Sequence, residues 1–182
     1  ETYFGQLKKL QDTTFTDTNL DTKTLQYFYK IDFTTNAIAH GSSSPASSLF
    51  LTGVPHDKSV ALSWNAQVPW TNTEYYILKQ HYSTQANPLA YDIIDSTTST
   101  SYTVTTLVNG YNYCFKILSK GQYANPNILR PLMNLSEKIY VTPFDDAAPC
   151  QPTLSVAGNC STSINKLVWT NPNNNCGTND IV

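Results

Sequence analysis

Residues 107–113, which read Leu-Val-Asn-Gly-Tyr-Asn-Tyr, constrain the fold of this 182-residue chain more than any other feature. A Leu, a turn and a Tyr six residues after the Leu form the pattern of a tyrosine corner, in which a Tyr hydroxyl bonds to backbone a few residues upstream. Sequence rich in β-branched and aromatic residues precedes the corner at 101–105 and follows it at 114–118. Such residues favour strands, so the pattern predicts two consecutive strands of an all-β domain.

Composition and charge argue against two classes of protein. Charged residues make up only 13% of the chain and the formal net charge is −2, whereas a nucleic-acid surface needs clustered Lys and Arg. No apolar run approaches the length that spans a membrane as a helix. The chain starts at Glu1 with no Met and no signal-peptide pattern, so we interpret it as a piece excised from a longer protein.

Two internal echoes indicate repeated modules. Residues 60–65 match 165–170, and the Trp residues of the two stretches, Trp64 and Trp169, are 105 positions apart. That separation is about one β-sandwich module of roughly 100 residues. Residues 15–31 match 102–117, around a second corner in which Leu20 and Tyr27 are seven positions apart.

The phase of these repeats predicts an all-β chain of tandem fibronectin type III or immunoglobulin-like antiparallel β-sandwiches, one complete and two partial. Residues 48–145 form the complete module. Residues 1–47 are the C-terminal half of a preceding module, and 146–182 are the N-terminal half of a following one. Half a sandwich exposes an apolar face, so we expect the missing halves in the parent protein.

Within the complete module, strands are expected at 49–54, 60–64, 75–79, 91–95, 102–107, 111–118 and 137–142. Alternation along a strand sends every second side chain to the core. The expected core is Val60, Leu62, Trp64, Tyr75, Ile77, Tyr102, Val104, Tyr113, Phe115 and Ile117.

Four phrases of the sequence resemble one family: residues 68–72, 109–116, 131–136 and 167–173. They are similar to the fibronectin type III-like modules of large secreted Bacteroidota proteins, usually labelled gliding motility-associated C-terminal domain proteins. The likeness spans most of 46–182 and, more weakly, 1–45. It implies export by the type IX secretion system and display at, or release from, the outer cell surface. The family's C-terminal sorting domain is not in these residues.

The cysteines depart from the family in one respect. Relatives often pair a Cys at the position of Cys114 with one on the facing strand, where this chain has Tyr140. We therefore expect Cys114 to be unpaired. Cys150 and Cys176 fall at the same end of the following module, so they are expected to form a disulfide, because bridged Cα atoms lie within about 7 Å. Cys160 falls at the opposite end and is expected to pair beyond Val182 or to stay free.

No catalytic constellation is expected. His40, His56 and His81 fall in expected loops, and none lies beside a Cys, a Ser-Gly elbow or a carboxylate pair. Alternation turns Cys114 to the face of its strand opposite Tyr113 and Phe115, which favours a structural role over that of a nucleophile.

The segment 119–136 reads as a long loop between two strands, too long for an ordinary hairpin connection. Its apolar residues Ile128, Leu129, Leu132 and Met133 are candidates for partner contact, since long loops on rigid sandwiches often bind partners. The alternative is that they pack on their own sheet edge or on a neighbouring module.

Two further kinds of site are candidates. Asp145, Asp146 and Asp180 carry oxygen ligands near a module junction and could hold Ca²⁺, the one cofactor considered, although no Asp-x-Asp-x-Asp-Gly loop is present. Solvated linker residues are the alternative. The family resemblance also implies O-glycosylation at Asp-Ser/Thr triplets, which makes Ser96 and Thr13 candidates.

The expected function is a non-catalytic modular segment of a large secreted or cell-surface protein, acting as a spacer, scaffold or adhesin repeat. Its expected partners are other modules of the same chain, and surface or secretion-machinery proteins or glycans. The alternative is an accessory fibronectin type III or carbohydrate-binding region of a secreted hydrolase. A carbohydrate-binding role would be favoured if Trp70, Tyr76 and Tyr82 were coplanar and exposed.

Overall fold

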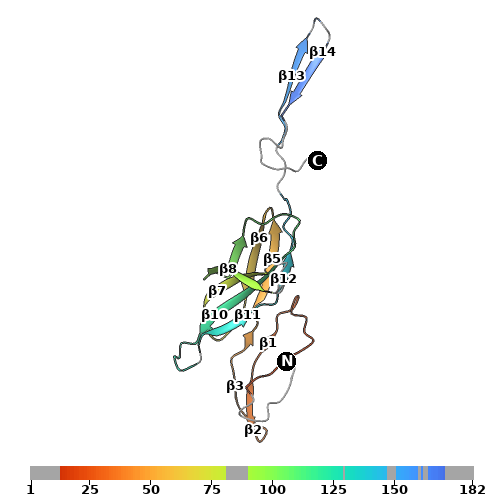
Figure 1. The fold of residues 1–182 in the computed structure, drawn as a ribbon. Coiled ribbons are helices and arrows are strands. Elements are labelled where there is room, and N and C mark those ends of the chain that lie inside the picture. The colour runs from red at the N-terminus through yellow and green to blue at the C-terminus, as the bar shows by residue number, and fades with distance from the viewer. Residues whose placement is uncertain are drawn as a thin grey trace. The chain divides into compact units, whose positions relative to one another are not determined.

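The computed structural model describes residues 13–80, 90–128, 130–146, 151–159, 161 and 164–170. In these residues all regular secondary structure is β-strand, and each pairing of known register is antiparallel (Figure 1). Contacts divide the chain into two compact units. The first comprises 1–52, 62–102 and 114–140, and the second 53–61, 103–113 and 141–182.

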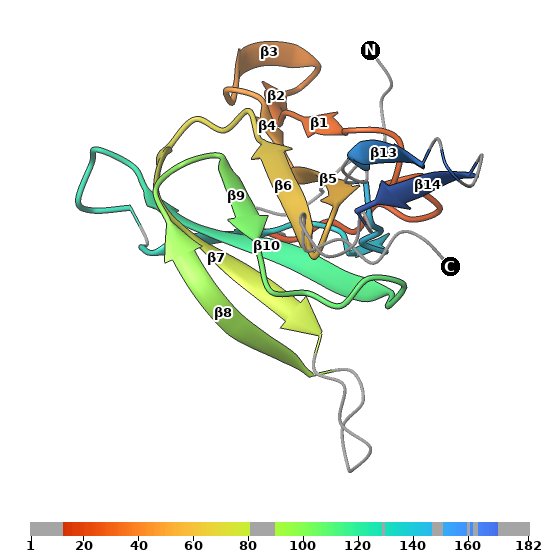
Figure 2. The ribbon, with the colours of Figure 1, turned by 90° about the horizontal axis from the view of Figure 1, so that it is seen from above.

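Two sheets make up the middle of the chain. The larger has the order β11-β10-β7-β8, with β12 also paired to β10, and the smaller has the order β5-β6-β9. Figure 2 shows β7, β8 and β10 side by side. The bounds are β5 (Phe50–His56), β6 (Ser59–Asn65), β7 (Thr71–Gln80), β8 (Tyr91–Thr97), β9 (Ser101–Val104), β10 (Tyr113–Gln122), β11 (Leu132–Leu135) and β12 (Ile139–Val141).

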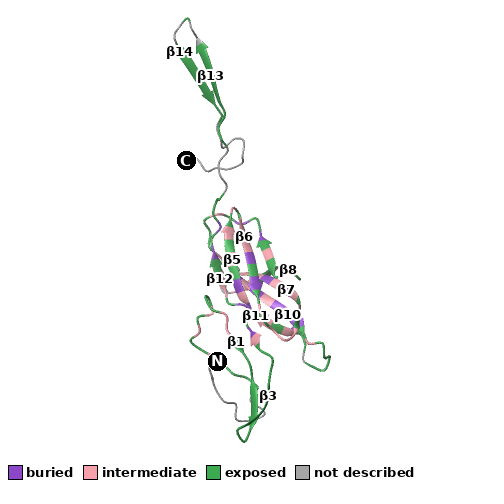
Figure 3. Cartoon of the chain, turned by 180° about the vertical axis from the view of Figure 1, so that it is seen from behind, coloured by how far each residue is buried: buried purple, intermediate pink, exposed green. Residues whose placement is uncertain are grey.

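The core follows the alternation of the strands. Val60, Leu62 and Trp64 of β6 are 0–5% exposed, and Ile77, Phe115 and Ile117 of the larger sheet are fully buried. Figure 3 shows buried residues in the strands of the two sheets. The Trp64 ring meets the Tyr75 ring edge to face, with centroids 5.4 Å apart, and so joins the two sheets. This arrangement is consistent with a β-sandwich. Among the predicted core residues, only Tyr102 and Tyr113 are half-buried rather than buried.

The predicted tyrosine corner is confirmed. The Val108 N–H donates to the Tyr113 hydroxyl oxygen at 3.0 Å, directly after Leu107. Gly110 has a φ of +79°, a conformation that an L side chain rarely adopts. The second corner also forms, since the Asp21 N–H, directly after Leu20, donates to the Tyr27 hydroxyl at 3.2 Å.

The prediction of a long irregular loop at 119–136 was wrong. β10 continues to Gln122 and pairs with β11, in a register that runs from Leu118↔Leu135 to Gly121↔Leu132. The extension was missed because its inward positions carry small residues, the buried Ser119 and Gly121, in place of large apolar ones. A Cβ on Gly121 would lie only 2.6 Å from Trp70 Cδ1, so the sheet has no room for a larger residue there.

Smaller differences concern strand ends and the histidines. β9 stops at Val104, before Thr106 takes a φ of +60°, and β12 is shorter than expected. His40 lies in β3 and His56 ends β5, so the prediction that both lie in loops was wrong. His81 lies outside the described residues.

Short strands flank the two larger sheets. β1 (Phe28–Tyr29) pairs with β4 (Ala46–Ser47), β2 (Asp32–Thr35) with β3 (Ile38–Ser42), and β13 (Leu154–Asn159) with β14 (Ile164–Trp169). Two-stranded sheets cannot bury a core of their own. Their large apolar side chains are accordingly exposed: Phe28, Phe33, Ile38, Leu154, Val156, Ile164, Leu167, Val168 and Trp169. Phe15 and Ile31, which lie outside the strands, are exposed as well.

The buried Ser47 holds the N-terminal segment to the larger sheet. Its hydroxyl accepts from Gln26 Nε2 at 3.0 Å, and its carbonyl accepts from Asn134 Nδ2 at 3.0 Å. Its own N–H donates to the Gln67 carbonyl at 2.7 Å. One small residue thereby connects three segments that lie far apart in the sequence.

Replacing Tyr113 by Phe is expected to lower the free energy of unfolding by about 1 kcal/mol, the usual net contribution of one hydrogen bond. Denaturant unfolding of the wild type and Y113F measures the difference. Tyr111 is 65% exposed, so Y111F serves as the matched control and should unfold like the wild type. Equal stability of Y113F and Y111F would contradict a stabilising corner.

Candidate functional site

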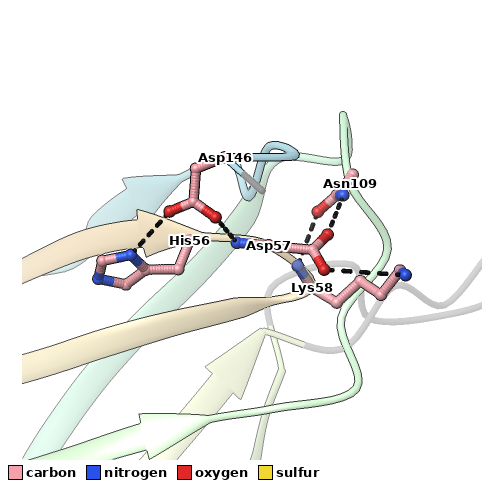
Figure 4. Close-up of polar contacts among 5 residues, drawn as sticks. All are labelled: His56, Asp57, Lys58, Asn109 and Asp146. Carbon is pink, nitrogen blue, oxygen red and sulfur yellow. Dashed lines mark hydrogen bonds and ion pairs between the residues drawn. The ribbon is translucent and has the colours of Figure 1, made fainter. Parts of the chain in front are cut away.

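The strongest polar constellation lies where β5 ends and β6 begins (Figure 4). We use the name linker for the segment that follows β12, of which residues 142–146 are described. We call the constellation the linker clamp, because Asp146 of the linker holds the β5–β6 turn. One carboxylate oxygen of Asp146, Oδ2, lies 3.0 Å from His56 Nδ1, and the other, Oδ1, accepts from the Asp57 N–H at 3.0 Å. The linker clamp comprises His56, Asp57, Lys58, Asn109 and Asp146.

Asn109 of the corner loop completes the linker clamp. Its side-chain oxygen accepts from the Lys58 N–H at 2.8 Å, and its amide nitrogen donates to Asp57 Oδ1 at 2.7 Å. The Leu107 N–H also donates to the Lys58 carbonyl at 2.9 Å. The N–H groups of Asp57 and Lys58, the two residues of the tight turn, therefore both have acceptors. These acceptors are side chains from other segments, so the turn does not depend on its own carbonyls.

The start of the linker is attached by two further contacts. The Gly110 N–H donates to the Pro143 carbonyl at 2.8 Å, and the Thr142 hydroxyl donates to Asn112 Oδ1 at 3.4 Å. The Pro143 side chain is fully buried. The chain from Thr142 to Asp146 is therefore held by its own unit, and Asp146 is an exposed linker residue that is also hydrogen-bonded.

The contacts of Asp146 also favour the ionised form of its carboxyl group. The hydrogen bond with His56 lowers the pKa of the Asp146 carboxyl, and the Asp57 N–H lowers it further. The carboxylate is stabilised in its ionised form, with both oxygens already engaged by protein groups.

The structure brings together no other metal ligands in the segments that it describes. No group of three or more His, Cys, Asp or Glu residues there could hold a metal ion. Asp145 is exposed beside Asp146, and Asp180 lies outside the described residues. The Ca²⁺ site therefore stays a prediction without structural support.

The candidate contact residues lie on and near the β10–β11 hairpin. Met133 is 50% exposed, Ile128 is 38% exposed and Leu132 is half-buried. Leu129 lies outside the described residues. Met133 and Leu135 both belong to β11, and the exposure of Leu135 is 47%, so this hairpin presents apolar surface to solvent.

The two described aromatic residues proposed for glycan binding, Trp70 and Tyr76, are half-buried. The Trp70 ring packs edge-on against Tyr123, with centroids 5.9 Å apart, and its Nε1 donates to Asn72 Oδ1 at 3.1 Å. Tyr76 is half-buried and donates its hydroxyl to Glu74 at 2.6 Å. Tyr82 lies outside the described residues. Trp70 and Tyr76 thus already contact neighbouring side chains of their own unit.

Cys114 is a buried free thiol, as predicted. Its Sγ lies 3.2 Å from the Tyr91 hydroxyl, and Lys116 Nζ sits 4.9 Å from the centre of the Tyr91 ring. Burial, followed by the contact with Cys114, raises the pKa of Tyr91. A thiol covered in this way is inaccessible to substrate. Cys150, Cys160 and Cys176 lie outside the described residues, so their pairing stays a prediction.

The two candidate glycosylation residues are both exposed. Ser96 lies on β8, where its N–H donates to Asp95 Oδ1 at 2.7 Å. Thr13 lies in irregular chain near the N-terminal end of the described residues. Exposure alone does not show whether Ser96 or Thr13 is glycosylated.

Sequence reasoning missed the linker clamp apart from Asp146. The Asp57-Lys58 pair between two strand-like runs is a signal for a two-residue hairpin turn. The partners of that turn come from residues 51 and 89 positions away in sequence, which no local pattern reveals.

Comparisons with protein-family models, curated proteins and solved structures gave no match. The described part of the chain also contains no helix long and apolar enough to cross a membrane.

Replacing Asp146 by Asn is expected to remove a pH-dependent part of the stability. A carboxyl whose folded pKa is depressed stabilises the fold above its unfolded pKa, and this contribution is lost as pH falls through the folded pKa. The melting temperature of the wild type should therefore exceed that of D146N at pH 5–7, and the gap should close towards pH 2. A gap that is constant with pH would contradict this assignment.

Proposed function

We propose that this chain is a non-catalytic segment of tandem fibronectin type III-like modules in a large secreted or cell-surface protein, where it acts as a spacer or scaffold. The observation that carries the proposal is the recurrence of two local devices at the positions that the sequence repeats predict. The tyrosine corner and the Trp-bearing hairpin each occur twice.

The two corners share one hydrogen bond. In each, the residue that directly follows a Leu donates its N–H to the hydroxyl of a Tyr downstream, from Val108 to Tyr113 and from Asp21 to Tyr27. The second corner carries one extra residue and keeps the bond. A shared contact that survives an insertion supports common module architecture over chance similarity.

The two Trp-bearing hairpins also share a contact. In β5–β6 the Thr52 hydroxyl donates to the Ser63 carbonyl at 3.2 Å, and in β13–β14 the Ser155 hydroxyl donates to the Val168 carbonyl at 3.3 Å. Each accepting carbonyl directly precedes a Trp in the sequence. This match supports the reading of β13–β14 as the first two strands of a following module.

The side chains of the β5–β6 hairpin are buried, whereas the equivalent side chains of β13–β14 are exposed. This is the difference expected between a whole module and half of one. Leu62 and Trp64 are 1% and 5% exposed, whereas the equivalent Leu167 and Trp169 are 52% and 66% exposed. The same side chains that close a core in one place lack a facing sheet in the other.

The linker clamp supports a spacer role. It holds the first residues of the linker by paired hydrogen bonds, and a buried Pro143 follows the last strand of the complete module. When linker ends are fixed and connections are rich in Pro, an array of modules extends further and bends less between modules.

The family resemblance supports type IX export and a place at the outer cell surface. The partners that fit this setting are other modules of the same chain and, in an adhesin, surface proteins or glycans. The apolar hairpin side chains Ile128, Leu132 and Met133 are the surface through which we propose such contacts.

Antibody labelling of producing cells tests the location. Antibodies against this chain should label intact cells as strongly as permeabilised cells, with an abundant cytoplasmic protein as the permeability control. Labelling only after permeabilisation would refute a surface protein. The purified chain should also show no turnover on glycan, ester or peptide panels.

A chimera tests the tandem architecture. If β13–β14 begins a module, placing residues 66–145 after Thr170 supplies the missing strands. Backbone amides of 154–169 should then exchange with deuterium at least about tenfold more slowly than in the original chain, because burial raises local opening free energy. The same chimera with Leu167→Ser is the control and should lose most of this protection. Unchanged exchange in the chimera, with its grafted strands folded, would contradict the tandem reading.

A further inference from the structure

We propose that Asn109 and Gly110 form a deamidation site, which the linker clamp keeps unreactive while it is closed and whose reaction opens the clamp irreversibly. These residues make up the one Asn-Gly dipeptide of the sequence. The inference concerns the chemistry of the linker clamp, so it holds whether or not the chain belongs to a tandem array of modules.

The reaction consumes only water. The backbone nitrogen of Gly110, having given up its proton, attacks Cγ of the Asn109 side chain, the bond between Cγ and Nδ2 breaks, and ammonia leaves. Water then opens the resulting cyclic imide at either of its carbonyls. One product is aspartate in an unchanged main chain, and the other is isoaspartate, whose main chain runs through Cγ. A Gly after the Asn favours the first step, because no side chain hinders the approach of its nitrogen.

The fold engages the attacking nitrogen. The Gly110 N–H donates to the Pro143 carbonyl at 2.8 Å, and the Tyr111 N–H donates to the Val108 carbonyl at 3.4 Å, which closes a turn around the dipeptide. The Pro143 side chain is fully buried, so the acceptor of the Gly110 N–H is held in place. A hydrogen-bonded backbone amide gives up its proton only when the structure around it opens.

The linker clamp also holds the group that would be attacked (Figure 4). The Asn109 side chain is half-buried, its oxygen accepts from the Lys58 N–H at 2.8 Å, and its Nδ2 donates to Asp57 Oδ1 at 2.7 Å. Because both ends of the amide are bonded, Cγ cannot move relative to the Gly110 nitrogen without breaking these bonds. Asp57 is itself held by Asp146, through its N–H at 3.0 Å.

Deamidation would remove the donor that Asp57 needs. An oxygen would replace Nδ2, so two carboxylates would face each other where Nδ2 and Asp57 Oδ1 now lie 2.7 Å apart. Like charges in contact repel each other. Isoaspartate would also lengthen the main chain before Gly110 by one carbon and displace the Gly110 N–H from the Pro143 carbonyl. Either product therefore opens the clamp, and the loss of ammonia prevents the original contacts from forming again.

This arrangement makes the reaction rate a measure of clamp opening. When opening and closing are fast, a reaction that occurs only in the open form proceeds in proportion to the population of that form. Changes that weaken the clamp should therefore accelerate deamidation at Asn109 more than changes of similar effect on overall stability made elsewhere.

Peptide mapping of the whole chain by mass spectrometry tests the protection. It follows the replacement of NH₂ by OH at Asn109 over time at neutral pH, and enzymatic methylation identifies isoaspartate. The chain unfolded in urea should react at least about tenfold faster than the folded wild type, because local opening limits the folded chain. D146A should react at a rate between the two, and H56A, which removes only the His56 contact of Asp146, should change the rate in the same direction.

T52A is the matched control for the clamp variants. It removes a hydroxyl contact with Ser63 in the same hairpin but outside the linker clamp, and it should deamidate at the wild-type rate. Near-ultraviolet circular dichroism establishes that each variant is folded under the conditions of the incubation.

N109D tests the effect of the product directly. A like charge raises the folded pKa of the new carboxyl, so N109D is destabilised above that pKa and recovers as pH falls through it. The difference in melting temperature between wild type and N109D should therefore widen from about pH 3 to about pH 7, the range in which carboxyl groups ionise. N109A removes the same amide without adding a charge, and its difference from the wild type should stay constant with pH.

Four results would overturn the inference. Equal rates in the folded and unfolded wild type would show that the clamp gives no protection. Absence of reaction in the unfolded chain would show that the dipeptide is no deamidation site. Equal acceleration in D146A and T52A would show that global unfolding, and not the clamp, controls the reaction. A difference between wild type and N109D that is constant with pH would show that the product does not open the clamp through charge.

Discussion

The burial of Trp64 against Tyr75 is the interaction on which the middle of the chain depends. The two rings belong to different sheets, so their contact at 5.4 Å holds those sheets together. Burying roughly 200 Å² of aromatic surface contributes about 5 kcal/mol. The Trp64 Nε1 is buried without a hydrogen-bond partner in the described structure, which costs about 1–3 kcal/mol. The apolar gain is the larger of the two, and this explains why the position tolerates an unsatisfied donor.

Polar contacts perform a different task at the places where segments join. Ser47 connects the N-terminal segment to the larger sheet, and Asp146 connects the linker to the β5–β6 turn. In both cases a side chain satisfies backbone or amide groups that lie far away in sequence. Such bonds contribute modest net energy because water competes for the same groups, yet they fix where a connecting segment starts.

The flanking segments show what happens when the same local sequence lacks its facing sheet. β14 keeps its pairing with β13 and its cross-strand hydroxyl contact, but Leu167 and Trp169 remain exposed. Pairing between neighbouring strands is a local property, and in β13–β14 it persists although the apolar side chains stay exposed. Core formation is not local, because it needs strands that come from distant sequence.

The sequence alone determined the features that depend on near neighbours. Alternation predicted Val60, Leu62, Trp64, Ile77, Phe115 and Ile117 as core, and the short Leu-to-Tyr spacings predicted both corners. Only the tertiary structure decided the extent of β10 and β11, because the small Ser119 and Gly121 face inward beside Trp70, and small residues give no apolar alternation to read. It also decided that Asp146 bonds to His56 and Asp57, which lie about 90 residues earlier in the sequence. A carboxylate in a linker has the same sequence signature whether it is solvated, binds a metal ion or holds a distant turn, and only the fold brings its partner within hydrogen-bonding distance.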